Sequence, residues 1–202
     1  ADDRAALDAY LERLSSADPR NLARAEQLAY WINLYNALTV QVVLDHPEED
    51  SILGMGAGWF SRGPWNEERL EIAGEPVTLN DIEHRILRPI WQDHRIHYAV
   101  NCASFSCPDL APEAYTRDNA GRLMDAGEHS YLRHPRGLEF RPDGTLSLSS
   151  IFEWYVEDFG GTRDTLLDYL ADQRQDLADR LRDYRGRIHY HYDWSLNAAT
   201  DR

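Results

Sequence analysis

The chain has 202 residues, of which 35 are acidic and 21 are arginine, and it contains no lysine. A formal net charge of −14 argues against nucleic acid or an anionic membrane surface as a partner, because such binding requires a basic face. We interpret this halophile-like composition as solubility in salt or a GC-rich genome, not as a surface for a cationic partner. No run of about 18 apolar residues is present, so no membrane span is predicted.

Periodicity and turn residues predict a mostly helical α+β fold around a small, largely antiparallel sheet, as one domain over residues 1–202. Helices are predicted over residues 1–18, 21–44, 79–89, 118–132, 150–159 and 164–184. Strands are predicted over residues 69–72, 75–77, 96–100, 138–140, 146–148 and 186–197. The third helix is capped by Thr78 or Asn80 and closed by Pro89.

A long irregular stretch separates the second helix from the first hairpin. It begins after His46-Pro47 and holds several glycines together with Trp59, Phe60 and Trp65. A loop of this length is often a lid or a binding loop. The preceding helix is apolar nearly all round and therefore buried. Its amides Asn33 and Asn36 need hydrogen-bond partners, either in neighbouring loops, where they fix the packing, or in a site wall.

The segment from Arg95 to Leu110, RIHYAVNCASFSCPDL, holds both cysteines of the chain. The alternation from Ile96 to Val100 predicts a strand that ends in a small, polar loop, where a scaffold presents chemistry. Two cysteines spaced C-x4-C are too few for a disulfide scaffold or a four-thiolate zinc site. They are either a short-loop disulfide or one reactive thiol beside a packed neighbour.

Five sequence blocks, in this order, resemble the DUF547 family, a domain of unknown function found in bacteria and plants. The blocks are AYWINLYNALTV (29–40), LNDIEHRILRP (79–89), IHYAVNCASFSCP (96–108), LSSIFEWYVEDFG (148–160) and YHYDWSLN (190–197). The resemblance covers roughly residues 7–197 and implies no assigned activity. Bacterial members often carry a secretion signal, which implies a periplasmic or secreted protein.

The family pattern maps onto Glu83, His84, Cys102 and Cys107. Plant members have serine at the position of Cys107 and keep the cysteine at the position of Cys102. The resemblance therefore argues against a disulfide as the common purpose of the family. It makes Cys102 the better residue for chemistry.

The leading hypothesis is a cysteine-dependent hydrolase or acyltransferase, like cysteine peptidases or transglutaminases in chemistry. Cys102 attacks the amide or thioester carbonyl of a small-molecule or peptide substrate, and His84 shuttles the proton. Glu83 or Asp193 orients the imidazole, and backbone N–H groups of residues 103–106 form an oxyanion hole. His97 is a rival base, disfavoured because a strand would place it on the face opposite Cys102. The predicted binding residues are Asn33, Asn36, His97, Asn101, Ser104, Cys107, Trp194 and Asn197.

Two other functional classes are weighed against this hypothesis. One is a non-catalytic binding module with a Cys102–Cys107 disulfide, in which the loop from Gly54 to Trp65 holds a ligand. The other is a thiol–disulfide exchange protein that uses both sulfurs. Oligomeric state and substrate are not predicted.

Metal and glycosidase chemistry are also weighed, and no cofactor and no metal are predicted. His189, His191 and Asp193 share one face of the last predicted strand, a possible metal set that we interpret instead as a polar outer face. The i, i+4 carboxylates Glu153 and Glu157 are a weak glycosidase signal, because acidic helix faces are common in so acidic a chain.

Overall fold

The computed structural model describes residues 2–56 and 63–197. Helix α1 (Asp2–Ser16) packs against α2 (Arg24–Asp45), and a 3-10 turn, Pro19–Asn21, connects them. The Asp18 carboxylate accepts the N–H of Arg20 at 3.0 Å and so caps this turn, as Asp-Pro predicts. Helix α2 is buried around most of its circumference, which confirms the prediction from its apolar sequence.

The predicted hairpin is confirmed. Strands β1 (Leu70–Ile72) and β2 (Glu75–Val77) pair antiparallel, with Leu70 opposite Val77. The turn residues Ala73 and Gly74 have φ of 54° and 85°, the left-handed conformation that such a tight turn requires.

The third predicted helix begins as a π-helical segment, Asp81–Leu87, and continues as α3 (Arg88–Trp91). Proline 89 does not close it. Pro89 lies in the first turn of α3, where an N–H is not needed, and the helix ends at Gln92 in the left-handed conformation. The wide turn directs Ile82, Glu83 and Leu87 inward. Such π-type turns are rare and often occur at functional sites.

The strand predicted over residues 96–100 is wrong. Residues His94–Tyr98 form a 3-10 helix, capped by the Asp93 carboxylate, which accepts the Arg95 N–H at 2.9 Å. Polar and apolar residues alternate here as they would in a strand with one face in solvent. Ile96, His97 and Tyr98 are nevertheless all buried, so the alternation does not separate a buried face from an exposed one. Cys102 therefore follows a helical turn instead of ending a strand.

The second half contains helix α4 (Ala120–Arg133) and a second sheet. Strand β3 (Leu138–Phe140) pairs antiparallel with β4 (Leu146–Ser149), and β5 (His189–His191) lies parallel to β4. The predicted last strand is thus shorter than expected. Beyond it, Ser195 and Leu196 form single bridges to Ser51 and Ser104.

The helices of this half are shorter than their sequence patterns indicate. Helix α5 (Ile151–Trp154) passes into a 3-10 turn, Val156–Phe159. The helix predicted over 164–184 is interrupted. Helix α6 (Arg163–Gln173) ends where Arg174 turns its side chain to Asp176 and the Leu132 carbonyl, and a 3-10 turn, Gln175–Leu177, precedes α7 (Ala178–Arg182).

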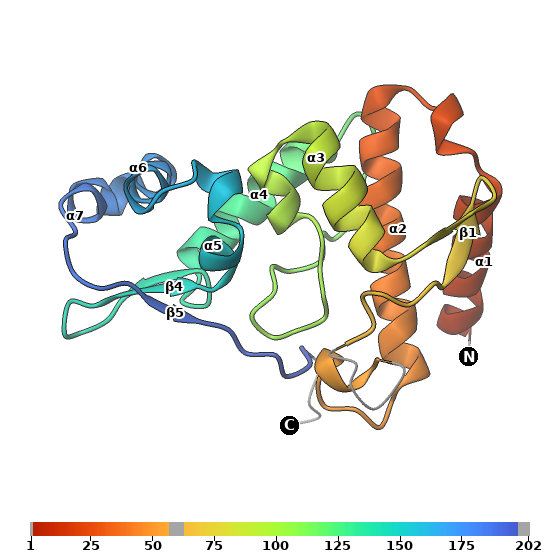
Figure 1. Cartoon of the computed structure of the whole chain (residues 1–202), viewed down its shortest axis with the longest axis horizontal. Coiled ribbons are helices and arrows are strands. Elements are labelled where there is room, and N and C mark those ends of the chain that lie inside the picture. Colours follow the sequence, from red (N-terminus) through yellow and green to blue (C-terminus); the bar gives the residue numbers. More distant parts are fainter. Residues whose placement is uncertain (1, 57–62, 198–202) are drawn as a thin grey trace.

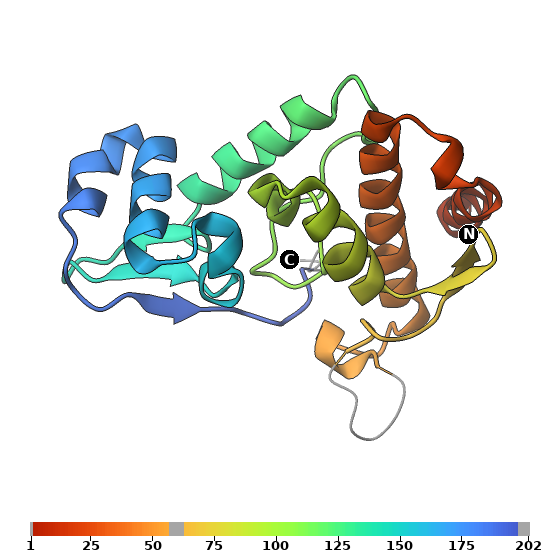
Figure 2. The ribbon, with the colours of Figure 1, turned by 45° about the horizontal axis from the view of Figure 1, so that its top comes forward.

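Two large buried clusters organise the described residues. One joins α1, α2, the hairpin and the π-helical segment; the other joins the second sheet with α5, α6 and α7. Helix α4 contributes to both, with Leu123 in the first and Leu132 in the second, and it spans the two lobes in Figures 1 and 2. The predicted fold class, mostly helical α+β with small and mostly antiparallel sheets, is confirmed.

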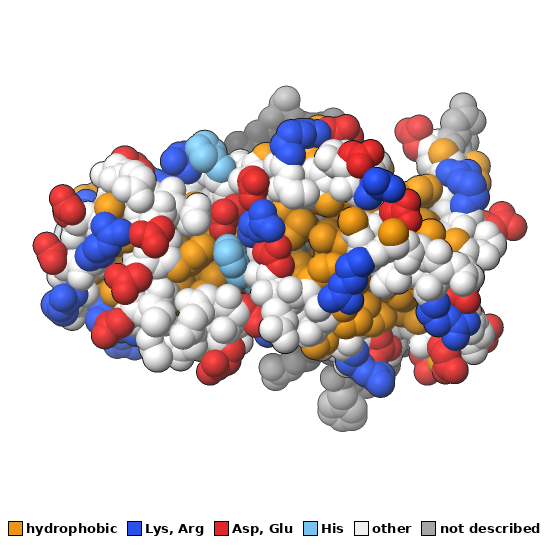
Figure 3. Space-filling view, turned by 90° about the horizontal axis from the view of Figure 1, so that it is seen from above, with side chains coloured by type: hydrophobic (Ala, Val, Ile, Leu, Met, Phe, Trp, Pro, Cys, Tyr) orange, Lys and Arg blue, Asp and Glu red, His pale blue; other side chains and the backbone are white. Residues whose placement is uncertain are grey.

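The face seen in Figure 3 carries interspersed charges of both signs around exposed apolar atoms. Within residues 2–56 and 63–197, none of the helices has the length and apolar character that crossing a bilayer requires.

Candidate functional site

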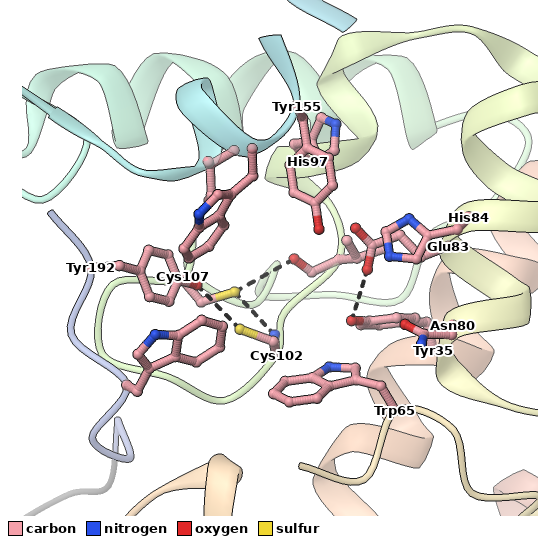
Figure 4. Close-up of a pocket in the computed structure, with 14 residues that line it drawn as sticks. Tyr35, Trp65, Asn80, Glu83, His84, His97, Cys102, Cys107, Tyr155 and Tyr192 are labelled. Carbon is pink, nitrogen blue, oxygen red and sulfur yellow. Dashed lines mark hydrogen bonds between the residues drawn. The ribbon is translucent and has the colours of Figure 1, made fainter. Parts of the chain in front are cut away.

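A pocket of about 330 Å³ lies between the two buried clusters. Residues of α2 and the π-helical segment form one wall, and residues of α5 and the segment after β5 form the other (Figure 4). The cysteine loop lies at its base. The lining residues are Tyr35, Trp65, Asn80, Glu83, His84, His97, Val100, Cys102, Cys107, Ile151, Trp154, Tyr155, Tyr192 and Trp194.

Side-chain amides hold the cysteine loop in position. Asn36 on α2 donates to the Ala99 carbonyl at 2.9 Å and accepts the Asn101 N–H at 2.8 Å. Asn101, only 7% exposed, accepts the Ala103 N–H at 2.7 Å and donates to the Pro108 carbonyl. Ala103 adopts φ of 65°, a left-handed conformation that is uncommon outside glycine and reverses the chain directly after Cys102.

The backbone N–H groups of this loop are already engaged, which contradicts the expected oxyanion hole. Ala103 donates to Asn101, Phe105 donates to the Ser195 carbonyl at 2.7 Å, and Ser106 donates to the Asp193 carbonyl at 3.2 Å. The remaining N–H, from Ser104, contributes to the lowered pKa of Cys102. Docking of the segment after β5 therefore uses the donors that a carbonyl oxygen would need.

The Cys102 thiol is half-buried and has two hydroxyl neighbours. Its Sγ lies 3.2 Å from Ser104 Oγ and 3.3 Å from the Tyr192 hydroxyl. A hydrogen bond from the Cys107 thiol lowers the pKa of Cys102, burial opposes this, and Ser104 and Tyr192 lower it further, to about 7. Near neutral pH a large fraction of Cys102 is therefore the nucleophilic thiolate.

Cys107 is buried behind Cys102 and has the opposite character. Its Sγ accepts the Cys102 N–H at 3.0 Å and lies 3.9 Å from the Val100 carbonyl. Burial raises the pKa of the Cys107 thiol well above its ordinary value. Both cysteines are free thiols. Because the pKa of Cys102 is lowered and that of Cys107 is raised, Cys102 is the one of the two that ionises.

His84 lies on the wall facing Cys102, and its hydrogen bond fixes its tautomer. Arg88 Nη1 lies 3.0 Å from His84 Nδ1. Because a guanidinium group only donates, Nδ1 accepts, and the neutral ring carries its proton on Nε2. Burial lowers the pKa of His84, so the ring is neutral at pH 7. The resting imidazole therefore offers a donor to the pocket, whereas a proton shuttle requires a base.

Glu83 does not orient His84. It is 8% exposed, lines the same wall and accepts a hydrogen bond from the Tyr35 hydroxyl at 3.1 Å. Figure 4 shows this pair across the pocket from Cys102. The second expected orienting residue, Asp193, is exposed and accepts hydrogen bonds from the Ser195 N–H and hydroxyl. It is not among the residues that line the pocket.

His97 lines the pocket but is bound to a carboxylate. Its Nε2 lies 2.7 Å from Asp158 Oδ2, and its ring stacks on Tyr155 with centroids 4.4 Å apart. Arg88 donates to the same carboxylate at 2.6 Å. Burial opposes ionisation of Asp158, but the hydrogen bonds from His97 and Arg88 hold its pKa below the ordinary value.

Some of the other predicted binding residues line the pocket, and the rest hold backbone segments in place. Trp194 lines the pocket, and Ser104, fully buried, contacts the Cys102 sulfur. Asn33 bonds both ways to the Tyr115 backbone, away from the pocket, and the Asn197 N–H donates to the Ala103 carbonyl. Asn33 and Asn36 therefore bond the backbone of neighbouring loops and fix their packing, and neither lines the pocket.

Sequence reasoning missed the aromatic walls. Tyr35, Tyr155 and Tyr192 are not among the predicted site residues, although all three line the pocket. The signal for them in the sequence is their position within the family-like blocks, close to the predicted site residues. Of the long glycine-rich loop, Trp65 lines the pocket, while Trp59 and Phe60 lie outside the described residues.

The alternative metal and glycosidase sets do not assemble. The His189 and His191 rings lie parallel on β5 with centroids 6.3 Å apart, but Asp193 turns to Ser195. Across the described ranges, no group of three or more His, Cys, Asp or Glu side chains is placed to hold a metal ion. Glu153 and Glu157 line different pockets, so they do not face one substrate.

A family model described as "Protein of unknown function, DUF547" matches residues 19–132, more than half of the chain. The chain therefore belongs to the DUF547 family, as the sequence blocks predict. Neither the comparison with curated proteins nor the comparison with solved structures gives a match. The matched range holds both cysteines, Glu83, His84 and His97, whereas the aromatic wall from Ile151 to Trp194 lies beyond it.

Proposed function

We propose that this chain is a thiol-dependent acyltransferase or hydrolase in which Cys102 carries the acyl group. The observation that carries the proposal is a half-buried thiol with a pKa of about 7, set between two hydroxyls at the base of a pocket with aromatic walls. A structural cysteine in apolar surroundings has a raised pKa, as Cys107 does.

The reaction begins with attack of the Cys102 thiolate on a substrate carbonyl carbon. A C–S bond forms, the bond to the leaving group breaks, and the acyl group becomes a thioester on Cys102. Water or another protic acceptor then attacks this thioester and releases a proton to solvent. The C–S bond breaks, the acid or acylated acceptor leaves, and Cys102 is regenerated as the thiolate. A thioester substrate suits the site better than an amide, because a thiolate departs without the proton that an amide nitrogen requires.

Carbonyl polarisation comes from the facing wall. The neutral His84 ring carries its proton on Nε2, and the Tyr155 hydroxyl also lines the pocket. Either donor supplies the role that the engaged loop N–H groups do not. His84 thus acts as a hydrogen-bond donor to developing negative charge, in place of the proton shuttle expected from the sequence.

Alkylation with iodoacetamide as a function of pH tests the nucleophile. We expect one alkylated cysteine by intact mass, mapped to Cys102, with a rate that rises to half its maximum near pH 7. The Cys102→Ser variant should be unreactive, and Cys107→Ser should still be alkylated. A half-maximum near about 8.5, the value of an ordinary thiol, would contradict the proposal.

Acyl transfer itself is tested with a small aryl or alkyl thioester. An acyl adduct on Cys102, detected by mass after acid quenching, and release of free thiol in excess of enzyme are the expected results. An inert thiol under conditions where iodoacetamide reacts would exclude the acyl mechanism while leaving the thiolate intact.

A second function, thiol–disulfide exchange, is favoured by the pairing of the sulfurs. Cys102 is accessible with a lowered pKa, and Cys107 lies buried behind it with a raised pKa. An attacking and a resolving thiol divide in this way. Reversible loss of two hydrogens with a disulfide oxidant, and reduction of a test disulfide that requires Cys107, would identify this chemistry. Under the acyl mechanism Cys107→Ser retains turnover.

A stable disulfide in a non-catalytic binding module makes a different prediction. The protein isolated without reductant would gain two hydrogens on reduction and would not take up iodoacetamide beforehand.

A further inference from the structure

Glu83 is a buried carboxylate in an aromatic pocket without a counter-charge. Its side chain is 8% exposed, and its hydrogen-bond partner is the neutral hydroxyl of Tyr35. Within the described residues, no arginine or histidine nitrogen lies within ion-pair distance of Glu83; the nearby Arg88 is bound to Asp158 and His84. Desolvating a carboxylate without a cation is costly, so this position gains from a cationic ligand.

The surroundings of Glu83 are suited to an ammonium group. Asn80, one turn earlier, lines the same wall; its amide nitrogen donates to Asn66 at 2.6 Å, which leaves its own oxygen as a second acceptor. Trp65 and Tyr155 present aromatic rings to the same space (Figure 4). Aromatic faces attract cations, most strongly where water is excluded.

We propose that the substrate carries a primary ammonium group, which docks against Glu83 and Asn80 under the aromatic rings. As a statement about a substrate, this inference rests on the proposed function of Cys102. Glu83 and Cys102 line the same pocket of about 330 Å³, on opposite sides of it (Figure 4). The Tyr35 hydroxyl donates to Glu83, and burial first, then charge on Glu83 and on Cys102, raises the pKa of Tyr35. A compact ammonium-bearing acyl compound therefore reaches both the anchoring carboxylate and the thiol.

The probe is butylammonium, and its neutral counterpart is 1-butanol. Three tryptophans line the pocket, so binding is followed by intrinsic fluorescence and checked by calorimetry. We expect butylammonium to bind at least about tenfold more tightly than 1-butanol, a difference of about 1.4 kcal/mol, because its ammonium group makes a charge-assisted hydrogen bond to Glu83 that the alcohol cannot make. Equal affinity for the two probes would overturn the proposal.

Variants assign the binding to Glu83. Glu83→Gln should lose about tenfold or more of the butylammonium affinity and leave the weak binding of 1-butanol unchanged. Asn80→Ala should lose less. Glu153→Gln, which removes a carboxylate from a different pocket, is the matched control and should bind as the wild type does. Unchanged butylammonium affinity in Glu83→Gln would also overturn the proposal.

Protection of Cys102 separates this inference from the proposed function and needs no variant. Butylammonium should slow iodoacetamide alkylation of Cys102 in the wild-type protein, and 1-butanol at the same concentration should not. If Cys102 is acylated by thioesters yet butylammonium neither binds nor protects, the ammonium site fails alone. If butylammonium binds through Glu83 and Cys102 forms no acyl adduct, the acyl mechanism fails alone.

Discussion

The Tyr192 hydroxyl lies 3.3 Å from the Cys102 sulfur, although 90 positions separate the two residues in the sequence. The contact depends on the segment after β5, which crosses back over the cysteine loop. There, Asp193 donates its N–H to Ser106 Oγ at 2.8 Å and accepts the Ser106 N–H. The last part of the chain thus completes a site whose thiol lies in its middle.

Replacing Tyr192 by phenylalanine should raise the pKa of Cys102. The variant keeps the ring but removes a hydroxyl that stabilises the thiolate. We expect alkylation at pH 7 to slow by about fivefold, because a pKa about one unit higher lowers the thiolate fraction at that pH from about one half to about one tenth. The maximum rate at high pH should be unchanged. Tyr190→Phe is the matched control, because Tyr190 lies in β5, two residues before Tyr192, and lines a different pocket. A parallel slowing at all pH values would indicate altered access.

Replacing Asn36 by alanine should destabilise the fold and misplace the thiol together. Two backbone groups of the cysteine loop lose their partner, Ala99 O and Asn101 N. Buried groups left unsatisfied cost about 1–3 kcal/mol each, so we expect a loss of about 2–6 kcal/mol in the free energy of unfolding by urea. Cys102 alkylation at neutral pH should also slow.

Asn33→Ala is the matched control for that experiment. Asn33 lies on the same helix and also bonds backbone N–H and C=O groups, but those of Tyr115. It should lower stability by a similar amount and leave the pH profile of Cys102 unchanged. Equal effects of both variants on Cys102 would show that general loosening, not loop position, sets its reactivity.

The sequence predicted the elements whose cause is local. Asp18-Pro19 ends a helix and Ala73-Gly74 turns a hairpin through backbone preferences that neighbouring residues determine. The alternation around His97 wrongly predicted a strand, because the sequence does not show that this histidine is buried. Its burial depends on the hydrogen bond to Asp158, which lies 61 positions away. The hydrogen bond between Glu83 and Tyr35 likewise depends on a tertiary contact between residues 48 positions apart, so the sequence alone could not show that Glu83 binds Tyr35 instead of orienting His84.

Replacing Asp158 by asparagine should flatten the acid limb of the stability profile. His97 and Arg88 hold the pKa of Asp158 below its ordinary value. The ionised form therefore stabilises the folded state fully above the unfolded pKa of about 3.9, and this contribution is lost as pH falls below that value. Between pH 6 and pH 3 the wild type should lose about 1 kcal/mol more unfolding free energy than Asp158→Asn, because only the pH range between the unfolded pKa and pH 3 contributes.

The control for this measurement is Asp193→Asn. Asp193 also has a lowered pKa, caused by its hydrogen bonds to Ser195, but its side chain is exposed. Solvent screens such a group, so its replacement should change the acid limb less than Asp158→Asn does. A profile of Asp158→Asn parallel to the wild type would show that the carboxylate contributes no folded-state stabilisation.

Replacing Arg88 by methionine should raise the pKa of His84 and allow the neutral ring to carry its proton on either nitrogen. Burial is the largest cause of the lowered pKa, and the Arg88 charge adds to it. Methionine keeps apolar contact with the Tyr155 ring, over which Arg88 lies, and removes the charge and the donor to Nδ1. Imidazole titration by NMR should show a higher pKa, and the ring nitrogen shifts should show loss of the pure Nε2–H form.

The same variant separates the two parts that His84 can play. If its Nε2–H polarises the substrate carbonyl, acylation of Cys102 by a thioester should slow in Arg88→Met, while iodoacetamide alkylation, which develops no oxyanion, should not. Arg85→Met removes an exposed arginine of the same helical segment that pairs with Asp81, and should leave both rates unchanged. Faster acylation in Arg88→Met, with a free Nδ1, would instead show that His84 works as the base.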